Sequence, residues 1–562
     1  MLMVLKKFNL YLIAALIFVV FTVSSGGCEE NYTSSRTEEL IRVGISSNDF
    51  QKLDHKEISL TSGGKLEVFD KFLNLKIHET SAGEILKFEI EKTVFKISKN
   101  NEKVSENIVG PIVVKSSENQ PIQVVNLKRK GKQAAYRGVF EIAKFPRKET
   151  QLSLVNVLPL EDYLKGVVPN ELPTHFGMEA LKAQAIAARN YAIRPRVKRF
   201  SHFDVCDSVQ SQVYFGFNTE EPKSNEAIEM TKGLVALYEG DVILALYSST
   251  AGGYTESYEN AFSEPGGEIF PAKPLPYLKG KPDTEGIPVL NNEKNAREFY
   301  TTSPATFDVK SRYYRWTREW TGEELRKVLN DNLRSYRFSD LISPKVGNAT
   351  DIGKIKRVDV PKRGVAGKAF EISIKTDRGE WTIKKELLIR RILKKDGSAL
   401  PSANLVFENY ADKDGYLVRL KAFGGGFGHG VGMSQFGASY MSQNGYSYDQ
   451  ILQRYYNDVA IGTWPVYLTS EYNTLPVKQR FYSPKDKAEL FIENFEGIES
   501  FNFMINSKKV SLGKKELEAK KVRISLDKYI KKGINEIVYY SIDDNFEGKS
   551  VKAWVEVFNR AD

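Results

Sequence analysis

One segment constrains the fold of this chain more than any other: the sixteen residues Met178–Ile193, which contain six alanines and neither glycine nor proline. Alanine has the highest intrinsic helix propensity, so this composition predicts an α-helix. Because small side chains occur on every face of such a helix, other elements can approach it closely from all sides. The sequence therefore predicts a central, enclosed helix.

The segments around this helix have the pattern of short strands. Runs such as Lys87–Ser98 alternate apolar and polar side chains, and Gly, Asn and Asp separate them. Two more helices are expected, at about residues 322–333 and 448–457. With 562 residues, 12 % aromatic side chains and more Gly than Pro, the chain is too long for one core and too strand-rich for an all-α protein. We expect an α+β fold of several domains.

A shift in composition marks a domain boundary in the last part of the chain. Beyond about residue 475 the chain changes to alternating segments rich in Lys and Glu. This change predicts a separate β-rich domain over residues 475–562.

The N-terminus has the features of an export signal. Lys6 and Lys7 precede an apolar run over residues 8–23, and the chain then turns small and polar up to Cys28. We expect a signal peptide over residues 1–27 and a polar tether over 28–39. Cys28 follows two glycines, as a lipid-attachment cysteine does, so lipidation, plain cleavage and an uncleaved membrane anchor all stay open. The protein is expected to be exported to the cell envelope, anchored there as a lipoprotein.

Charge and common motifs exclude several functions. The net charge of +10 is spread along the chain without a long basic block, so no nucleic-acid partner is expected. The glycines at 424–432 contain no GxGxxG, the segment Gly432–Gly437 is one residue too long for a GxSxG elbow, and HExxH is absent. Dinucleotide-binding, serine-hydrolase and zincin interpretations therefore have no support.

Three separated stretches could carry chemistry, and the first is Leu158–Pro173. It places Glu171 among apolar residues, and partial desolvation would raise the pKa of its carboxyl, as a general acid requires. A purely structural role, in which Glu171 accepts a backbone hydrogen bond at a strand-to-helix junction, stays open. On the helix that follows, Lys182 and Arg189 are seven residues apart and share a face that could bind an anionic or polar polymer.

The second and third stretches are Tyr247–Glu256 and Phe427–Ala438. Both combine polar side chains with glycines that allow a ligand to approach the backbone, although ordinary tight turns have the same composition. Four side chains in them could line a site: Ser249, Thr250, His429 and Gln435.

In this order, the three stretches resemble the SpoIID/LytB family, the group of sporulation stage II protein D and amidase enhancers that act on bacterial peptidoglycan. The resemblance covers about residues 40–465. It implies one peptidoglycan-acting domain over this range, whose middle, at about 264–402, is rich in insertions. The segments that carry it are Glu161–Pro173, Glu179–Tyr191, Ser248–Glu256 and Gly428–Ala438, joined by Asp204–Asp207, Ser211–Gly216 and Tyr455–Tyr456.

The resemblance implies a lytic transglycosylase that cleaves MurNAc–GlcNAc linkages of glycan strands stripped of stem peptides, without a cofactor. It implies Glu171 as the catalytic acid and Lys182 and Arg189 as residues lining the cleft. Ser249, Thr250, His429 and Gln435 are carried over more loosely, also as cleft-lining residues. The alternative is a glycan-binding protein without catalysis that enhances an N-acetylmuramoyl-L-alanine amidase, and a weaker one is an envelope scaffold.

One departure from the family concerns metal. Some members bind zinc near the segment Asp204–Asp207, but here Gln210 and Ser211 stand where a histidine and a second cysteine would be expected. His202 and Cys206 by themselves do not complete a tetrahedral site. The sequence therefore predicts no metal.

Overall fold

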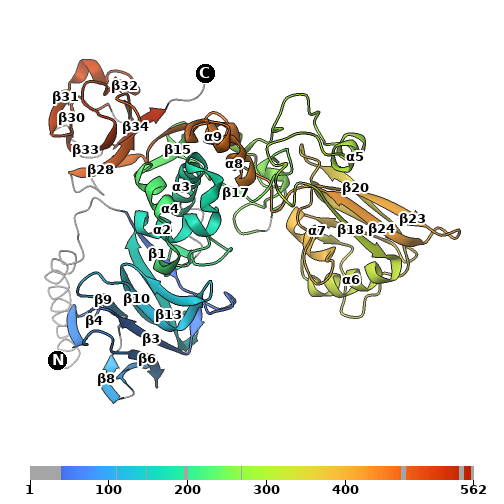
Figure 1. The fold of residues 1–562 in the computed structure, drawn as a ribbon, viewed down its shortest axis with the longest axis horizontal. Coiled ribbons are helices and arrows are strands. Elements are labelled where there is room, and N and C mark those ends of the chain that lie inside the picture. The colour runs from blue at the N-terminus through green and yellow to red at the C-terminus, as the bar shows by residue number, and fades with distance from the viewer. Residues whose placement is uncertain are drawn as a thin grey trace, which may run out of the picture. The chain divides into compact units, whose positions relative to one another are not determined.

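The computed structural model (Figure 1) describes residues 39–100, 102–108, 110–146, 148–194, 200–267, 269–469, 476–495, 497–542 and 550–558. The expected signal peptide, Cys28 and all of the tether except Glu39 lie outside these residues. Strands outweigh helices throughout, which confirms the α+β class. Within the described ranges no helix is both long and apolar enough to cross a bilayer.

The chain forms two compact units. The first comprises residues up to Leu160 together with 474–479 and 537–540, and the second comprises residues 161–473, 480–536 and 541–562.

The first unit is built from antiparallel sheets whose strands bury alternate side chains, as in β4, where Leu66, Val68 and Asp70 are buried. One sheet has the order β1-β13-β12-β9-β4-β5, with β2 beside β13, and the other has the order β11-β10-β3-β6-β7-β8. The bounds in the first sheet are Leu40–Gly44 (β1), Asp54–His55 (β2), Leu66–Asp70 (β4), Leu75–Glu79 (β5), Ile112–Ser116 (β9), Val139–Phe145 (β12) and Lys148–Pro159 (β13). In the second they are Glu57–Ser62 (β3), Leu86–Glu91 (β6), Val94–Lys99 (β7), Glu102–Ile108 (β8), Ile122–Arg129 (β10) and Lys132–Tyr136 (β11).

The alanine-rich segment forms helix α3, Met178–Ile193, at the centre of the second unit. Twelve of its residues are buried, including all six alanines. The small side chains let α3 pack against α4 (Pro222–Glu229), α8 (Gln435–Gln443), α9 (Tyr448–Tyr455) and strand β15 (Leu234–Tyr238). The prediction of an enclosed central helix is therefore confirmed.

The other two expected helices are also present, as α6, Gly322–Ser335, and α9. Helices that the sequence did not predict are α2 (Leu160–Glu171), α5 (Glu293–Thr301), α7 (Glu386–Ile392), α4 and α8. Among these α2 matters most because it contains Pro169, which made a helix improbable by propensity. The proline lies in the last turn, where the Asn170 side-chain amide donates to the Gly166 carbonyl at 2.7 Å.

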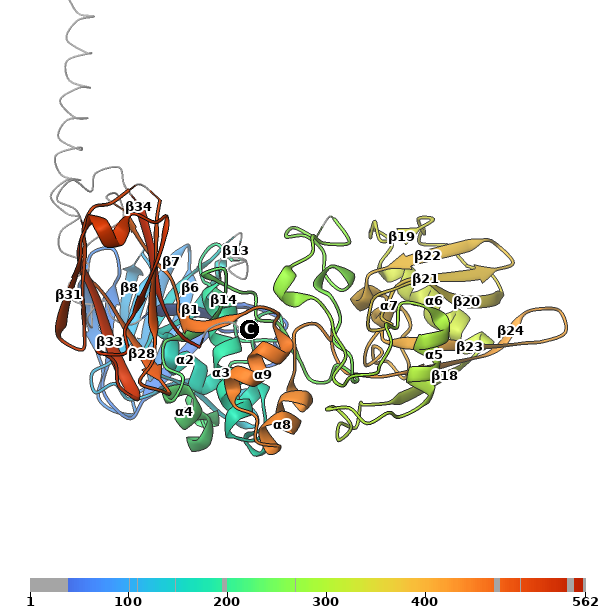
Figure 2. The same ribbon diagram turned by 90° about the horizontal axis from the view of Figure 1, so that it is seen from above.

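The insertion-rich middle of the chain is a folded segment with its own core. Its sheets have the orders β18-β24-β23 and β19-β22-β21-β20, and Figure 2 shows them grouped with α5, α6 and α7. Trp320, Leu329 and Ile389 are fully buried in this core. The strand bounds are Trp316–Thr321 (β18), Ile342–Ser343 (β19), Ile355–Arg363 (β20), Ala369–Thr376 (β21), Glu380–Lys384 (β22), Leu405–Ala411 (β23) and Leu417–Gly424 (β24).

The C-terminal region is β-rich, and its last strand joins a sheet that begins before residue 475. Strand β34 (Ser550–Phe558) pairs with β26 (Ala460–Thr463), which in turn pairs with β15. The sheet order is β16-β15-β26-β34-β29-β32, with β27 also beside β34. Backbone hydrogen bonding thus links the expected C-terminal domain to the α3 region. The remaining bounds are Asp241–Val242 (β16), Val466–Thr469 (β27), Val477–Ser483 (β28), Glu489–Asn494 (β29), Phe501–Ile505 (β30), Lys508–Leu512 (β31), Lys521–Ser525 (β32) and Gly533–Ile542 (β33).

Candidate functional site

Glu171 is the last residue of α2, and a short turn that begins at Pro173 connects it to α3. The sequence left open a structural role for Glu171 at a strand-to-helix junction. Glu171 does not lie at such a junction, because strand β13 ends earlier, at Pro159, and a full helix follows. Glu171 therefore projects from a helix end that is held against the central helix of the unit.

Glu171 has a desolvated carboxyl on a residue that is half-buried. Its Oε1 accepts a hydrogen bond of 2.7 Å from the Val213 backbone amide, and the residue as a whole is half-buried. Burial raises the pKa of this carboxyl from its ordinary 4.5 to about 7, and the Val213 hydrogen bond opposes the shift. A group with this pKa can both give and take a proton near neutral pH.

Two tyrosines, the buried Tyr163 and the half-buried Tyr247, lie near Glu171 and are connected by Gln212. The Tyr163 hydroxyl donates to Gln212 Oε1 at 3.2 Å, and Gln212 Nε2 donates to the Tyr247 oxygen at 3.1 Å and to the Ala188 carbonyl at 3.3 Å. Burial, with a contribution from the Glu171 charge, holds the pKa of both tyrosines well above the usual range. These contacts fix the segment that presents the Val213 amide to Glu171.

The two cations on α3 have partners within the protein. Arg189 is fully buried; its Nε and Nη2 donate to the Glu161 carboxylate at 2.9 and 2.7 Å, and its Nη1 donates to the Leu234 carbonyl at 2.8 Å. Lys182 donates to Glu179 at 2.7 Å and is 8 % exposed. Arg189 thus braces α3 against α2 and β15 and has no exposed surface to offer a ligand. A ligand-binding role for Lys182 stays a prediction.

The second and third stretches are interwoven. Strand β17 (Tyr247–Ser248) pairs in parallel with β25 (Met433–Ser434). Thr250 and Phe427 exchange two backbone hydrogen bonds, of 2.8 and 3.3 Å, and the Ser249 carbonyl accepts from the Phe436 amide at 3.1 Å. Residues almost two hundred positions apart in the sequence therefore form one local structure.

Gln435 connects this structure to Glu171. It begins α8, and its Nε2 donates to the Glu171 backbone carbonyl at 3.0 Å and to Gln184 Oε1 at 3.2 Å. Of the four side chains expected from these two stretches, Gln435 is the one with a direct contact to Glu171. Thr250 is buried, and its hydroxyl lies 2.8 Å from the Ser311 hydroxyl, whereas Ser249 is half-buried.

His429 is neutral in this structure. Burial, reinforced by the positive charges of Lys368 and Arg390, lowers the pKa of its imidazole to about 3. Its Nδ1 accepts a hydrogen bond of 3.1 Å from the Val431 amide, so the ring proton is on Nε2. His429 is therefore suited to a hydrogen-bonding role and not to one that needs a cationic imidazole.

Two buried carboxylates hold the insertion to these stretches, and sequence reasoning gave neither a role. Glu256 accepts from the amides of Val365 and Ala366, and Asp308 accepts from the amides of Gly252 and Gly253 and from the Ser434 hydroxyl. Burial raises the pKa of both. Glu256 belongs to the second stretch, but residue types alone give no sign of the backbone amides that it binds.

Cys206 lies among hydroxyl groups. Cys206 is a buried free thiol whose sulfur lies 3.4 Å from the hydroxyls of both Ser208 and Ser211. Across the part of the chain that the structure describes, no group of three or more His, Cys, Asp or Glu residues is arranged to hold a metal ion.

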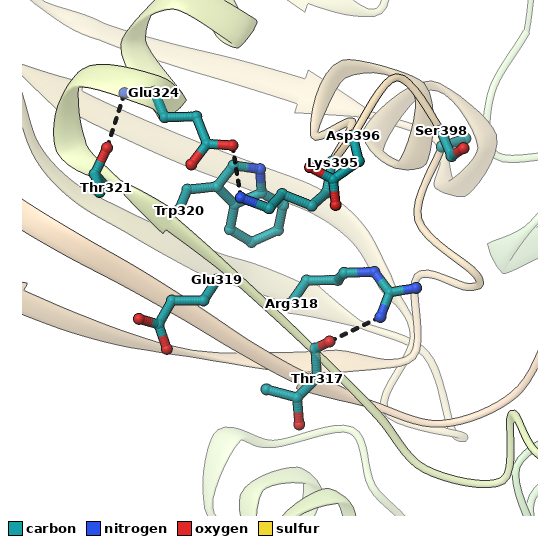
Figure 3. Close-up of a pocket in the computed structure, with 10 residues that line it drawn as sticks. Thr317, Arg318, Glu319, Trp320, Thr321, Glu324, Lys395, Asp396 and Ser398 are labelled. Carbon is teal, nitrogen blue, oxygen red and sulfur yellow. Dashed lines mark hydrogen bonds and ion pairs between the residues drawn. The ribbon is translucent and has the colours of Figure 1, made fainter.

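A surface hollow on the insertion shares no residue with the Glu171 site. Figure 3 shows it between β18, the start of α6 and the segment at 395–399, with Glu324 and Lys395 paired at 2.6 Å. The volume of the hollow is about 630 Å³. Trp320 lies beneath it but is fully buried, so its ring offers no surface to a ligand.

Comparisons with known proteins point to one family. Residues 148–238 match the family model described as stage II sporulation protein, and residues 264–432 match a domain of unknown function. The amidase enhancer of Bacillus subtilis is 30 % identical over 293 residues, which cover 52 % of this chain and 39 % of that protein. An uncharacterized protein of Brachyspira hyodysenteriae is 31 % identical over 320 residues, covering 56 % and 70 %. Stage II sporulation protein D of Bacillus subtilis is 29 % identical over 330 residues, covering 56 % and 77 %.

Proposed function

This chain belongs to the SpoIID/LytB family, and from that premise we propose that it is a peptidoglycan lytic transglycosylase. In this proposal it cleaves the MurNAc–GlcNAc linkages of glycan strands whose stem peptides have been removed. The observation that carries the proposal is the carboxyl of the half-buried Glu171, which is desolvated and has a pKa of about 7. The chain spans about two fifths of the length of the amidase enhancer, so the two proteins share only part of that protein's structure.

The proposed reaction needs only one carboxyl group. Protonated Glu171 gives its proton to the glycosidic oxygen as the bond from that oxygen to C1 of MurNAc breaks. The resulting carboxylate then takes the proton from the C6 hydroxyl of the same MurNAc, and the C6 oxygen bonds to C1. The products are a 1,6-anhydro-MurNAc end and a free hydroxyl on the departing sugar, and Glu171 is protonated again. No water is consumed, unlike in ordinary glycoside hydrolysis.

The surroundings of Glu171 suit both halves of this cycle. Desolvation favours the protonated form before the first step, and the Val213 amide stabilises the carboxylate that exists between the two steps. Gln435 holds the backbone at Glu171 through its hydrogen bond to the carbonyl. We propose Ser249, Thr250 and His429 as neutral residues that line or support the glycan cleft.

A second candidate is a glycan-binding enhancer of a cell-wall amidase. A relative that is 30 % identical carries the name amidase enhancer. In addition, Arg189 and Lys182 are already paired, with Glu161 and Glu179 respectively. These two cations are therefore less available to stabilise charge in a transition state than an enzyme would require. This candidate predicts glycan binding without new 1,6-anhydro ends.

For location, we propose export to the cell envelope with attachment to a membrane through a lipid on Cys28. Export follows from the apolar run after Lys6 and Lys7 in the sequence. Mass spectrometry of the protein purified from its native membrane tests the lipid, because a diacylglycerol on Cys28 changes the mass of the N-terminal peptide, and Cys28→Ser would release the protein.

Product analysis separates the two candidate functions. The purified full-length chain, its Glu171→Gln variant and the exposed-site control Glu226→Gln are incubated with peptide-free glycan strands. We expect 1,6-anhydro-MurNAc ends from the wild type and the control, and none from Glu171→Gln. If the wild type makes no such ends but accelerates an added amidase, the enhancer replaces the enzyme.

A further inference from the structure

Two aromatic rings and an arginine form a stacked group on the surface of the second unit. The rings of Tyr313 and Phe427 lie 4.4 Å apart between centroids and are inclined by 31°. The Arg312 guanidinium lies over the Tyr313 ring, 4.7 Å from its centroid. Phe427 is 39 % exposed although it is apolar, and Tyr313 is half-buried. An exposed aromatic pair of this kind offers a flat apolar surface with a cation at its edge.

The stack is held from both sides. The Gly426 amide donates to the Tyr313 carbonyl at 2.8 Å, and the Tyr313 amide donates to the Ser311 hydroxyl at 3.2 Å. Ser311 in turn contacts the Thr250 hydroxyl at 2.8 Å. The insertion thus supplies Tyr313, the Gly-rich third stretch supplies Phe427, and the second stretch joins them, so the rings are fixed before any ligand arrives.

Arg312 is available for a ligand. It is exposed, and within the described ranges its guanidinium makes no hydrogen bond or ion pair. Two other exposed arginines of the insertion are instead paired with acidic residues: Arg357 with Asp359 and Arg378 with Asp351. A guanidinium that stacks on a ring keeps its N–H edge free for a planar carboxylate.

Backbone contacts link the stack to Glu171. Phe427 pairs with Thr250, the adjacent Ser249 pairs with Phe436, and the adjacent Gln435 contacts the Glu171 carbonyl. Two backbone pairings, one side-chain contact and two chain steps correspond to a Cα path of about 30 Å at most. A glycan of several sugars bound at Glu171 could reach the stack.

We propose that Arg312, Tyr313 and Phe427 form a saccharide subsite that recognises a muramic acid residue bearing a free lactyl carboxylate. The inference rests on the proposed function and explains its preference for peptide-free strands. While a stem peptide is attached, the lactyl group is a neutral amide. Hydrolysis of that amide leaves a carboxylate, which Arg312 binds while the C–H face of the sugar lies on the aromatic rings.

A binding experiment tests the subsite separately from catalysis. The full-length Glu171→Gln chain is used as the parent so that strands stay intact, and labelled peptide-free strands are compared with the same strands after conversion of the carboxylates to methylamides. Arg312→Gln is expected to weaken binding of the carboxylate strands about tenfold and to leave the methylamide strands unchanged. Phe427→Ala should weaken both about fivefold.

The chain offers a matched control. Arg337 lies over the exposed ring of Phe338, with 4.3 Å from the guanidinium to the ring centroid, on the same insertion. Arg337→Gln should not change binding of either strand. If Arg312→Gln binds both strands as the parent does, or weakens both equally, the assignment of the carboxylate to Arg312 is wrong. If wild-type chain makes no 1,6-anhydro ends while Arg312 still discriminates the strands, the enzyme proposal fails and the subsite stands.

Discussion

Glu171 and Glu256 are both glutamates of the second unit whose pKa is raised by burial, but their surroundings differ. The Glu171 carboxyl accepts one hydrogen bond, from the Val213 amide, and the residue keeps part of its surface. Glu256 is fully buried and accepts hydrogen bonds from four donors: the amides of Ser257, Val365 and Ala366 and the side chain of Asn260.

The difference indicates what each carboxyl can do. Every donor around Glu256 is fixed in the fold, so the group ties the insertion to the second stretch and has no access to a substrate. The Glu171 residue is half-buried and its carboxyl accepts one hydrogen bond, so this carboxyl can accept a further partner. Burial is common to both carboxyls, and it is this remaining capacity that makes Glu171 the one we propose as the acid.

The largest effect should come from Glu171→Gln. The amide cannot give the proton to the leaving oxygen, so cleavage of peptide-free strands should fall at least about 1000-fold, or about 4 kcal/mol. Liquid chromatography of 1,6-anhydro products measures it, and circular dichroism checks the fold. Residual cleavage within tenfold of the wild type would remove Glu171 from the acid role.

Glu256→Gln should act on stability and not on the chemical step. The NH₂ group of the glutamine side chain would face the N–H donors that now bind the Glu256 carboxylate, and two donors cannot bond to each other. The free energy of unfolding should therefore fall by about 2–3 kcal/mol, which urea unfolding can measure. Product formation per folded molecule should stay near the wild-type value, as should both quantities in the exposed Glu226→Gln control. If Glu256→Gln abolishes cleavage without lowering the free energy of unfolding, the assignment of Glu256 to a structural role is wrong.

The pH dependence should separate the two carboxyls further. With a pKa of about 7, Glu171 loses its proton above neutrality, so cleavage should fall about tenfold per pH unit above 7 where proton donation limits the rate. Rates measured from pH 5 to pH 9 test this. A flat profile up to pH 9 would contradict it.

Stability should carry the same titration. The folded chain holds the Glu171 proton more tightly than the unfolded chain, where the pKa is near 4.5. Between about pH 4.5 and about pH 7 the folded state therefore binds more protons than the unfolded state. The free energy of unfolding should therefore decline over this window as pH rises. Glu171→Gln should decline less, and the difference between the two curves isolates Glu171 from other buried carboxyls.

The smallest effect should come from Gln435→Ala. Its side chain holds the Glu171 backbone carbonyl and Gln184 but does not face the proton transfer directly, so we expect about a threefold to tenfold loss of kcat. The matched control is Gln443→Ala at the other end of α8, whose amide contacts Ser439 and should leave kcat unchanged. Equal effects of the two variants would assign Gln435 to helix stability alone.

Local sequence accounted for the elements that depend on local physics. The alanine composition of Met178–Ile193 was sufficient for α3, because propensity and all-round small side chains act within the segment itself. Alternation was sufficient for the strand-rich class, and the choice of Glu171 followed from a carboxylate among apolar neighbours. The helix α2 was missed because Pro169 argues against a helix until its place in the last turn is known.

Tertiary structure decided what each polar group contacts. The sequence placed Lys182 and Arg189 on one face, but only the fold brings the half-buried Glu161 to Arg189 and buries that arginine. Likewise the Val213 amide at Glu171, the neutral state of His429 and the meeting of Tyr313 with Phe427 arise between segments far apart in the chain. A backbone amide leaves no trace in residue identity, and desolvation depends on every neighbour at once. The sequence and its family resemblance therefore offered Glu171 as a candidate acid, and the packing of distant segments set its pKa and its partners.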